Sequence, residues 1–133
     1  MKVLSVQEPW ASLVKEQIKQ IETRSWKTNY RGELYIHASK KICTKKEFAE
    51  YTPQISLLKE PIFDYGCIIA KCILDDCILM TEEFIEEIKN NKIEYLCGDY
   101  QVGRYAWILK DIKPLVKPIP AKGSLGIWKY KED

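Results

Sequence analysis

Three charged residues early in the chain, Lys19, Glu22 and Arg24, have the types and spacing to form a binding site. Side chains two residues apart in a β-strand point to the same face, so Glu22 and Arg24 should share one. A carboxylate beside a guanidinium group holds it in place, and the planar fork of an arginine suits a phosphate or the edge of a base. We therefore predict that these residues bind a ligand that carries phosphate or a base, with Lys19 adding positive charge.

Aromatic and basic residues are interleaved just beyond this group. Trp26 falls on the face of the charged pair if the strand continues, and Lys27, Tyr30 and Arg31 follow in the turn-forming segment KTNYRG. A tryptophan in this setting is either a core anchor or a platform on which a base stacks. All four are predicted to contribute to the binding site.

The remaining candidate ligand-binding residues are Trp10, His37 and Ser39. Trp10 falls on the apolar stripe of a helix, where a core position is the ordinary interpretation. His37 lies in the alternating segment LYIHASK, either as a hydrogen-bonded strand residue or in ligand binding or proton transfer. One histidine cannot build a multi-histidine metal site, and the five cysteines contain no C-x-x-C pair. We therefore predict free thiols, no metal and no other cofactor.

The elements that position these residues alternate irregularly between strand and helix. Apolar alternation predicts strands, and 3.6-residue periodicity with capping residues predicts helices. The predicted strands cover residues 1–6, 21–26, 34–38, 67–80, 106–112 and 126–130, and the predicted helices residues 8–18, 44–51 and 81–90. Thr44 and Glu47 form a capping box, and the long strand should bend near Asp75 and Asp76. The order predicts an α+β fold, a curled mixed sheet or barrel flanked by about three helices.

Length and composition narrow the class of protein. With 133 residues, 46% hydrophobic and 30% charged, the chain has the size and balance of one globular domain spanning residues 1–133. No apolar run approaches the ~20 residues that span a bilayer, and the first ten residues do not resemble a signal peptide. We expect a cytoplasmic protein that does not associate with membranes.

Charge is distributed unevenly along the chain. Residues 1–46 carry ten Lys/Arg against four Asp/Glu, residues 47–99 four against twelve, and residues 100–133 seven against three. If the terminal thirds meet in space, the fold has a basic side suited to a polyanion and an acidic side that could dock a basic protein. The alternative is that the lysines only solvate the surface.

Five ordered blocks of this sequence resemble the ASCH (activating-signal-cointegrator homology) family of the PUA-like superfamily. They are SVQEPWASLV, QIKQIETRSW, YRGELYIHASKK, GCIIAKCILDDC and GSLGIW. The second resembles the signature G-x-K-x-x-E-x-R, which falls on Lys19, Glu22 and Arg24. The signature glycine is replaced here by Gln17, at a position where glycine would permit a positive φ angle.

The resemblance implies a β-barrel with helices around it and a cleft for RNA or another nucleic acid beside the barrel. It also leaves an enzyme open, because some small bacterial ASCH proteins resemble N4-acetylcytidine amidohydrolases and others are associated with RNA cleavage. In the amidohydrolase branch a threonine nucleophile stands three residues after the lysine; that position is Glu22 here, and a carboxylate does not replace an activated hydroxyl.

Three functions therefore remain from the sequence. The preferred one is a module that binds RNA or a modified nucleoside in a basic, aromatic-lined cleft. The second is a small nucleoside amidohydrolase or ribonuclease in which Lys19 and Glu22 act as general acid and base. The third is an adaptor that docks a basic protein through the acidic middle third.

Overall fold

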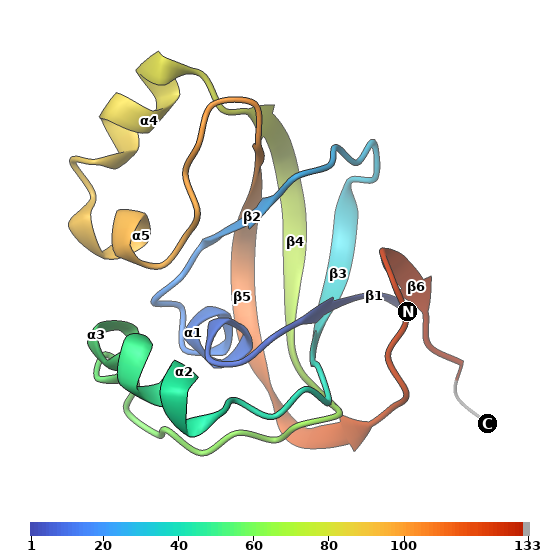
Figure 1. The fold of residues 1–133 in the computed structure, drawn as a ribbon. Helices are drawn as coiled ribbons and strands as arrows, with labels where there is room; N and C mark the ends of the chain where they lie inside the picture. The colour runs from blue at the N-terminus through green and yellow to red at the C-terminus, as the bar shows by residue number, and fades with distance from the viewer. Residues whose placement is uncertain (132–133) are drawn as a thin grey trace.

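The structure, a computed structural model, describes residues 1–131. Within them, six strands form one mixed sheet in the order β2-β5-β4-β3-β1-β6. The strands are β1 (Lys2–Val6), β2 (Ile21–Arg24), β3 (Gly32–Ala38), β4 (Cys67–Leu79), β5 (Tyr105–Pro120) and β6 (Ile127–Lys129). β1 and β3 are parallel and every other pair is antiparallel. The sheet curls strongly around the long strands β4 and β5 into a half-barrel (Figure 1).

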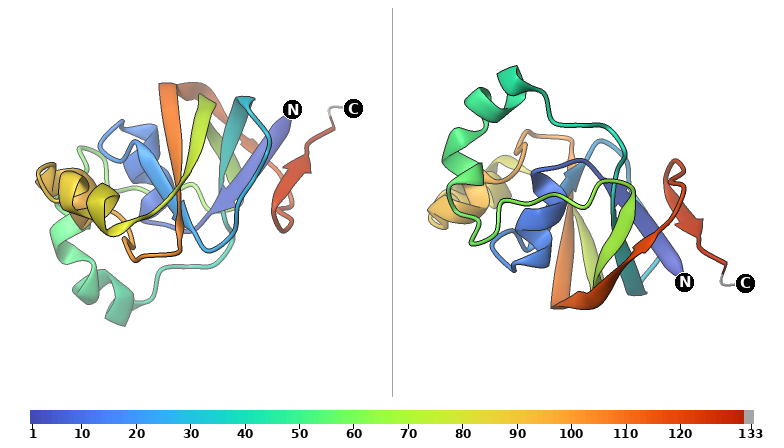
Figure 2. Two further views of the ribbon diagram at one scale, coloured as in Figure 1. Left: turned by 90° about the horizontal axis from the view of Figure 1, so that it is seen from above. Right: turned by 90° about the horizontal axis from the view of Figure 1, so that it is seen from below.

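Five short helices of the described chain lie to one side of the curled sheet (Figure 1). They are α1 (Trp10–Lys15), α2 (Lys45–Glu50), α3 (Thr52–Ile55), α4 (Glu82–Ile88) and α5 (Lys92–Leu96). α1 contributes Val14 to the main core, with Leu34, Leu74 and Trp107 from the sheet. The views from above and below show the other four helices farther out, with the N-terminus and β6 together at the opposite edge (Figure 2). This arrangement is an α+β fold of the PUA-like type, as the sequence predicts.

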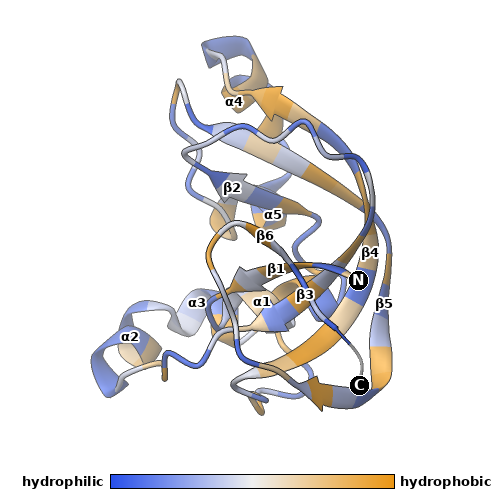
Figure 3. Ribbon diagram, turned by 90° about the vertical axis from the view of Figure 1, so that its right-hand side faces the viewer, coloured by the Kyte–Doolittle hydropathy of each residue, from blue (hydrophilic) through white to orange (hydrophobic). Residues whose placement is uncertain are grey.

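Several predicted details are confirmed. The first and last predicted strands lie in one curled sheet, where β1 and β6 are neighbours. The register of β4 shifts between Leu74 and Asp76, which is the predicted bend. Thr44 and Glu47 form the capping box of α2. β4 is mostly apolar along its length, as predicted (Figure 3), and buried and half-buried residues alternate from Ala70 to Leu74, as the pleat of a strand requires.

The first helix is shorter than residues 8–18 because the chain turns at Gln17, where φ is 64°. This left-handed conformation is the one that glycine adopts at least cost, and it occurs where the family signature has its glycine. The Gln17 side chain donates to the Ile112 carbonyl at 3.0 Å, which offsets part of the strain. The turn is therefore kept without glycine.

β5 is much longer than the predicted residues 106–112. Pro114, Pro118 and Pro120 argue against a strand there, because a proline cannot donate to a ladder. In the structure β2 pairs with β5 only from Tyr105 to Ile108, so the proline-bearing part of β5 has a neighbour on one side only. Proline is tolerated at such an edge. Helices α3 and α5 are further additions, and at four and five residues they are too short for clear periodicity.

The terminal thirds of the chain meet through β1–β6 and β2–β5. The acidic middle third contributes β4, which lies in the sheet between β3 and β5. Four of its acidic residues lie on α4: Glu82, Glu83, Glu86 and Glu87. Whether the fold has one basic and one acidic side stays a prediction.

Candidate functional site

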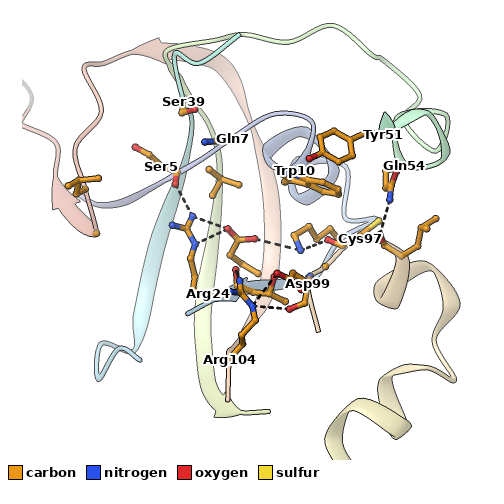
Figure 4. Close-up of a pocket in the computed structure, with 18 of the residues that line it drawn as sticks. Ser5, Gln7, Trp10, Arg24, Ser39, Tyr51, Gln54, Cys97, Asp99 and Arg104 are labelled. Atoms are coloured by element: carbon orange, nitrogen blue, oxygen red, sulfur yellow. Dashed lines mark hydrogen bonds and ion pairs between the residues drawn. The ribbon is translucent and has the colours of Figure 1, made fainter. Parts of the chain in front are cut away.

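A cavity of about 820 Å³ opens beside β2 and is referred to as the β2 pocket. Its walls come from the ends of β1 and β3, from α1, α3 and α5, and from residues 124–126 before β6. The volume lies within the ~300–1,000 Å³ of typical small-ligand sites. Figure 4 shows its labelled side chains around one hollow, with Arg24, Asp99 and Arg104 low in the view and Trp10 and Tyr51 high.

A continuous chain of polar contacts runs along β2 at the pocket wall. Arg24 donates from Nε to Glu22 Oε2 at 3.0 Å, and its Nη2 lies 2.8 Å from the same oxygen. Lys19 Nζ lies 3.6 Å from Glu22 Oε1 and donates to the Cys97 carbonyl at 2.6 Å. Arg24 Nη2 also donates to the Ser5 carbonyl at 2.9 Å. One carboxylate thus lies between two cations that are themselves fixed by backbone carbonyls.

The three charged residues in this chain of contacts differ in how far they are exposed to solvent. Lys19 is 1% exposed and Glu22 7% exposed, whereas the Arg24 side chain is 23% exposed. The two N–H groups of Arg24 Nη1 make no hydrogen bond with the described residues. Arg24 is therefore the member that remains able to contact an incoming anion or base.

Glu94 of α5 positions the start of β2 and was not identified from the sequence. Its carboxylate accepts from the backbone N–H of Gln20 at 2.9 Å and of Ile21 at 3.3 Å. Burial raises the pKa of Glu94 above its usual range, and the hydrogen bond from Gln20 and the charge of Lys19 oppose that rise. Nothing local could reveal this role, because Glu94 is more than seventy residues from its partners.

Arg104 is a second cation of the pocket that sequence reasoning missed. Its Nε donates to the Asp99 carbonyl at 3.1 Å, and its Nη2 donates to the Thr23 carbonyl at 3.3 Å. The charged wall of the pocket is defined as Lys19, Glu22, Arg24, Asp99 and Arg104. It carries three basic and two acidic side chains, so its net charge is positive.

The uncharged wall of the pocket is defined as Gln7, Trp10, Ser39, Tyr51 and Gln54. The rings of Trp10 and Tyr51 meet edge to face, with centroids 5.1 Å apart. Gln54 is held by a hydrogen bond from Nε2 to the Leu96 carbonyl at 3.1 Å. Aromatic faces and neutral polar groups therefore lie in the same cavity as the cations.

The structure brings five of the ten predicted site residues to this pocket: Trp10, Lys19, Glu22, Arg24 and Ser39. It places Trp26, Lys27, Tyr30, Arg31 and His37 outside its lining. Glu22 and Arg24 share a face, as the strand period predicts. Whether any of these residues binds a ligand stays a prediction.

The predicted strand over residues 21–26 is shorter in the structure, because β2 ends at Arg24 and Trp26 follows it in the connecting segment. The Trp26 ring packs edge-on against Trp107, with centroids 4.8 Å apart. The segment that follows is anchored elsewhere: Tyr30 donates from its hydroxyl to the Glu33 carbonyl at 2.6 Å, and Arg31 Nη2 lies 3.4 Å from Asp76 Oδ1. The aromatic and basic loop is therefore tied to the far end of β3 and β4 rather than to the pocket.

His37 lies beneath the C-terminal segment and is 1% exposed. Its Nε2 contacts the Ala121 carbonyl at 2.8 Å and its Nδ1 contacts Ser5 Oγ at 2.9 Å. A carbonyl only accepts, so Nε2 carries the proton, and in the neutral ring Nδ1 accepts from the Ser5 hydroxyl. Trp128 Nε1 donates to the same Ser5 Oγ at 3.0 Å. These contacts hold in place the segment that supplies residues 124–126 to the pocket. They favour the interpretation of His37 as a hydrogen-bonded strand residue.

The described residues hold no group of three or more His, Cys, Asp or Glu side chains that could bind a metal. All five cysteines are free thiols, and burial raises the pKa of Cys72 to about 12. Within residues 1–131, no helix has the length and apolar character needed to cross a membrane.

Comparison with known proteins finds that the family model for the ASCH domain matches residues 4–119. The chain is 33% identical over 132 residues to human activating signal cointegrator 1 and 32% identical to the mouse protein of that name. These matches cover 95% of this chain but 22% of each relative, so the chain spans about a fifth of their length.

Solved structures agree on the fold. A crystal structure of ASCH from Zymomonas mobilis has a TM-score of 0.55 at 16% identity, covering 90% of this chain and 72% of that one. A crystal structure of a mutant form of the Zymomonas mobilis protein gives a TM-score of 0.51 at 14% identity, covering 90% of this chain and 74% of that one. At these identities the likeness concerns the fold alone.

Proposed function

The chain belongs to the ASCH domain family of generally RNA-binding, PUA-like domains, and from that premise we propose that it binds nucleic acid, RNA by preference, in the β2 pocket. The observation that carries the proposal is the state of Arg24. Two of its nitrogens are fixed by Glu22 and Ser5, while Nη1 has no partner among the described residues. A guanidinium held in this way contacts a phosphate without first losing side-chain freedom.

The surroundings of Arg24 support a polyanionic ligand. Arg104 supplies a second guanidinium to the same wall, and the charged wall is net positive. The Lys19 side chain is only 2% exposed, so its ammonium acts on a ligand through its electric field rather than by direct contact.

The proposal is tested by comparing Arg24→Ala with Arg31→Ala on a short single-stranded RNA. Arg31 is a matched control, because it is an arginine in an ion pair with Asp76, outside the pocket. Arg24→Ala should weaken binding by about 1–3 kcal/mol, the value of a good bidentate contact. Arg31→Ala should change it much less. Equal losses from the two variants would locate the RNA site elsewhere, and the loop that holds Arg31 would become the better candidate.

A hydrolase remains the second candidate because Lys19 Nζ and Glu22 Oε1 lie 3.6 Å apart in the pocket wall. Such a pair could move a proton to or from a substrate held in the cavity. Against this, both groups are already engaged, Lys19 with the Cys97 carbonyl and Glu22 with Arg24.

Glu22→Gln separates the two functions, because it keeps the shape of the side chain and removes its charge. In a binding module it should weaken RNA affinity modestly, by holding Arg24 less firmly. In an enzyme it should lower turnover by about 10²–10⁴-fold. The assay incubates both proteins with RNA and with N4-acetylcytidine and follows products by chromatography. Turnover by the wild type that Glu22→Gln abolishes would overturn the binding-module assignment.

A further inference from the structure

We propose that the uncharged wall of the β2 pocket receives a single unpaired nucleobase, with its ring against Tyr51 and Trp10, its edge on Ser39 and Gln7, and its backbone phosphate at Arg24. The inference rests on the proposed nucleic-acid function and deepens it. It names the part of the ligand that enters the cavity and the residues that contact it.

The first observation is a set of unused polar groups. Ser39 Oγ is a buried atom with no hydrogen-bond partner among the described residues. The half-buried Tyr51 and the exposed Gln7 also line the pocket, and neither the Tyr51 hydroxyl nor the Gln7 amide makes a side-chain hydrogen bond with the described residues. Buried polar groups are normally paired, so an unpaired one at a cavity wall calls for an explanation. A ligand with its own donors and acceptors would supply the missing partners.

The chemistry of those groups fits a base edge better than a phosphate. A phosphate oxygen only accepts, and Arg24 and Arg104 already offer donors for it. Hydroxyls and the primary amide of Gln7 can each donate and accept. A base edge presents both kinds of group, so it is the part of a nucleotide that could satisfy all of these residues.

The second observation is the aromatic surface beside these groups. Tyr51 packs edge to face on Trp10, and both rings line the pocket. Figure 4 shows Ser39, Gln7, Trp10 and Tyr51 on the same side of the hollow, away from Arg104. Stacking on an aromatic ring together with hydrogen bonding at the edge is how proteins read unpaired RNA bases.

The third observation is the size and division of the cavity. About 820 Å³ suits a ligand of nucleotide size, whereas a paired helix would have to remain outside. The cations lie on one wall and the neutral groups on the other, as a nucleotide with a charged phosphate and a neutral base requires. A base would therefore have to leave its stack to enter, as in proteins that extrude a nucleotide into a pocket.

The test uses one RNA hairpin stem in three forms: with a single bulged nucleotide, with an abasic residue at the bulge, and fully paired. Dissociation constants are measured for the wild type, Tyr51→Ala, Ser39→Ala and Arg24→Ala. The matched control is Tyr95→Ala, which removes a partly exposed tyrosine that stacks on Tyr100 and does not line the pocket.

For the wild type we expect the bulged base to bind at least about 10-fold more tightly than the abasic bulge, since stacking of one base on an aromatic ring is a contribution of that order. Tyr51→Ala should bring the ratio close to one with little change in abasic affinity, and Tyr95→Ala should preserve it. Ser39→Ala should lower the ratio without affecting folding, because Ser39 Oγ makes no bond within the described residues.

Different results would overturn the base-binding inference and the proposed nucleic-acid function. Equal binding of the base and abasic bulges, with Arg24→Ala weakening both, would overturn the base-binding inference and leave the nucleic-acid function intact. Equal losses of the base preference in Tyr51→Ala and Tyr95→Ala would also overturn it. No binding of any RNA form, or binding that Arg24→Ala leaves unchanged, would overturn the proposed function itself.

Discussion

Removal of the Glu94 carboxylate should loosen the start of β2 and destabilise the protein. The Glu94→Ala change leaves the backbone N–H groups of Gln20 and Ile21 without their acceptor, and Glu94 is only 5% exposed. Each buried unpaired donor costs about 1–3 kcal/mol. The burial that raises the pKa of Glu94 offsets part of this, because the buried carboxylate is itself unfavourable. We expect a net loss of about 3 kcal/mol in the free energy of unfolding.

The assay is urea unfolding followed by circular dichroism, with free energies from linear extrapolation. Glu86→Ala is the matched control, because Glu86 of α4 forms an exposed ion pair with Lys89 at 2.9 Å. The control should leave the urea midpoint nearly unchanged. Glu94→Gln should fall between the two, because its amide oxygen still accepts one N–H group. A midpoint for Glu94→Ala equal to that of the control would refute the reasoning.

The pH dependence provides an independent check. A carboxylate whose pKa is raised by folding binds protons more tightly in the folded state than in the unfolded state. Its contribution to stability is then largest below the unfolded pKa and is lost as the pH rises through the higher folded pKa. Wild-type stability should therefore decline as the pH rises above the ordinary glutamate pKa of 4.5, and Glu94→Gln should reduce that decline. A steeper decline in the variant would contradict the assignment.

Three further changes test other parts of the structure. The logarithm of RNA affinity should fall linearly with the logarithm of salt concentration. Arg24→Ala should make this slope shallower by about 0.7, the value for one phosphate contact on a single strand. An unchanged slope would mean that Arg24 does not contact a phosphate. His37→Ala should destabilise the fold by about 3 kcal/mol, because the Ala121 carbonyl and the Ser5 hydroxyl lose their partner, and hydrogen exchange at Trp128 Nε1 should become faster. Gln17→Gly should change the free energy of unfolding by less than about 0.5 kcal/mol, because relief of the left-handed φ balances the lost hydrogen bond, whereas Gln17→Ala should lose about 1 kcal/mol.

Local patterns were sufficient for much of the fold. The capping box of α2, the bend near Asp75 and the strand that carries Glu22 and Arg24 depend on neighbouring residues only, and each is found where the sequence predicts it. The family blocks indicated the curled sheet but not its strand order, so the pairing of β1 with β6 comes from the structure. The prolines of β5 misled the prediction, because whether a strand lies at an edge depends on its neighbours in the sheet.

The candidate site was also predictable from the sequence only in part. Residues two apart on β2 could be placed on one face from the strand period alone, so the pairing of Glu22 with Arg24 was predictable. Glu94, Asp99 and Arg104 could not be found, because only the packing of α5 and the chain after it against β2 brings them near. Trp26 lies outside the pocket lining, beyond the end of β2, which stops two residues before the predicted end of the strand.

The sequence by itself thus determined the family, the curled α+β fold and the charged group on β2, since these follow from short-range periodicity and ordered motifs. The tertiary structure decided which side of that group faces a cavity and what else lines it. Tyr51, Gln54 and Ser39 reach the β2 pocket from segments that have no sequence proximity to Arg24. Their convergence comes from side-chain packing between distant elements, which no local propensity encodes.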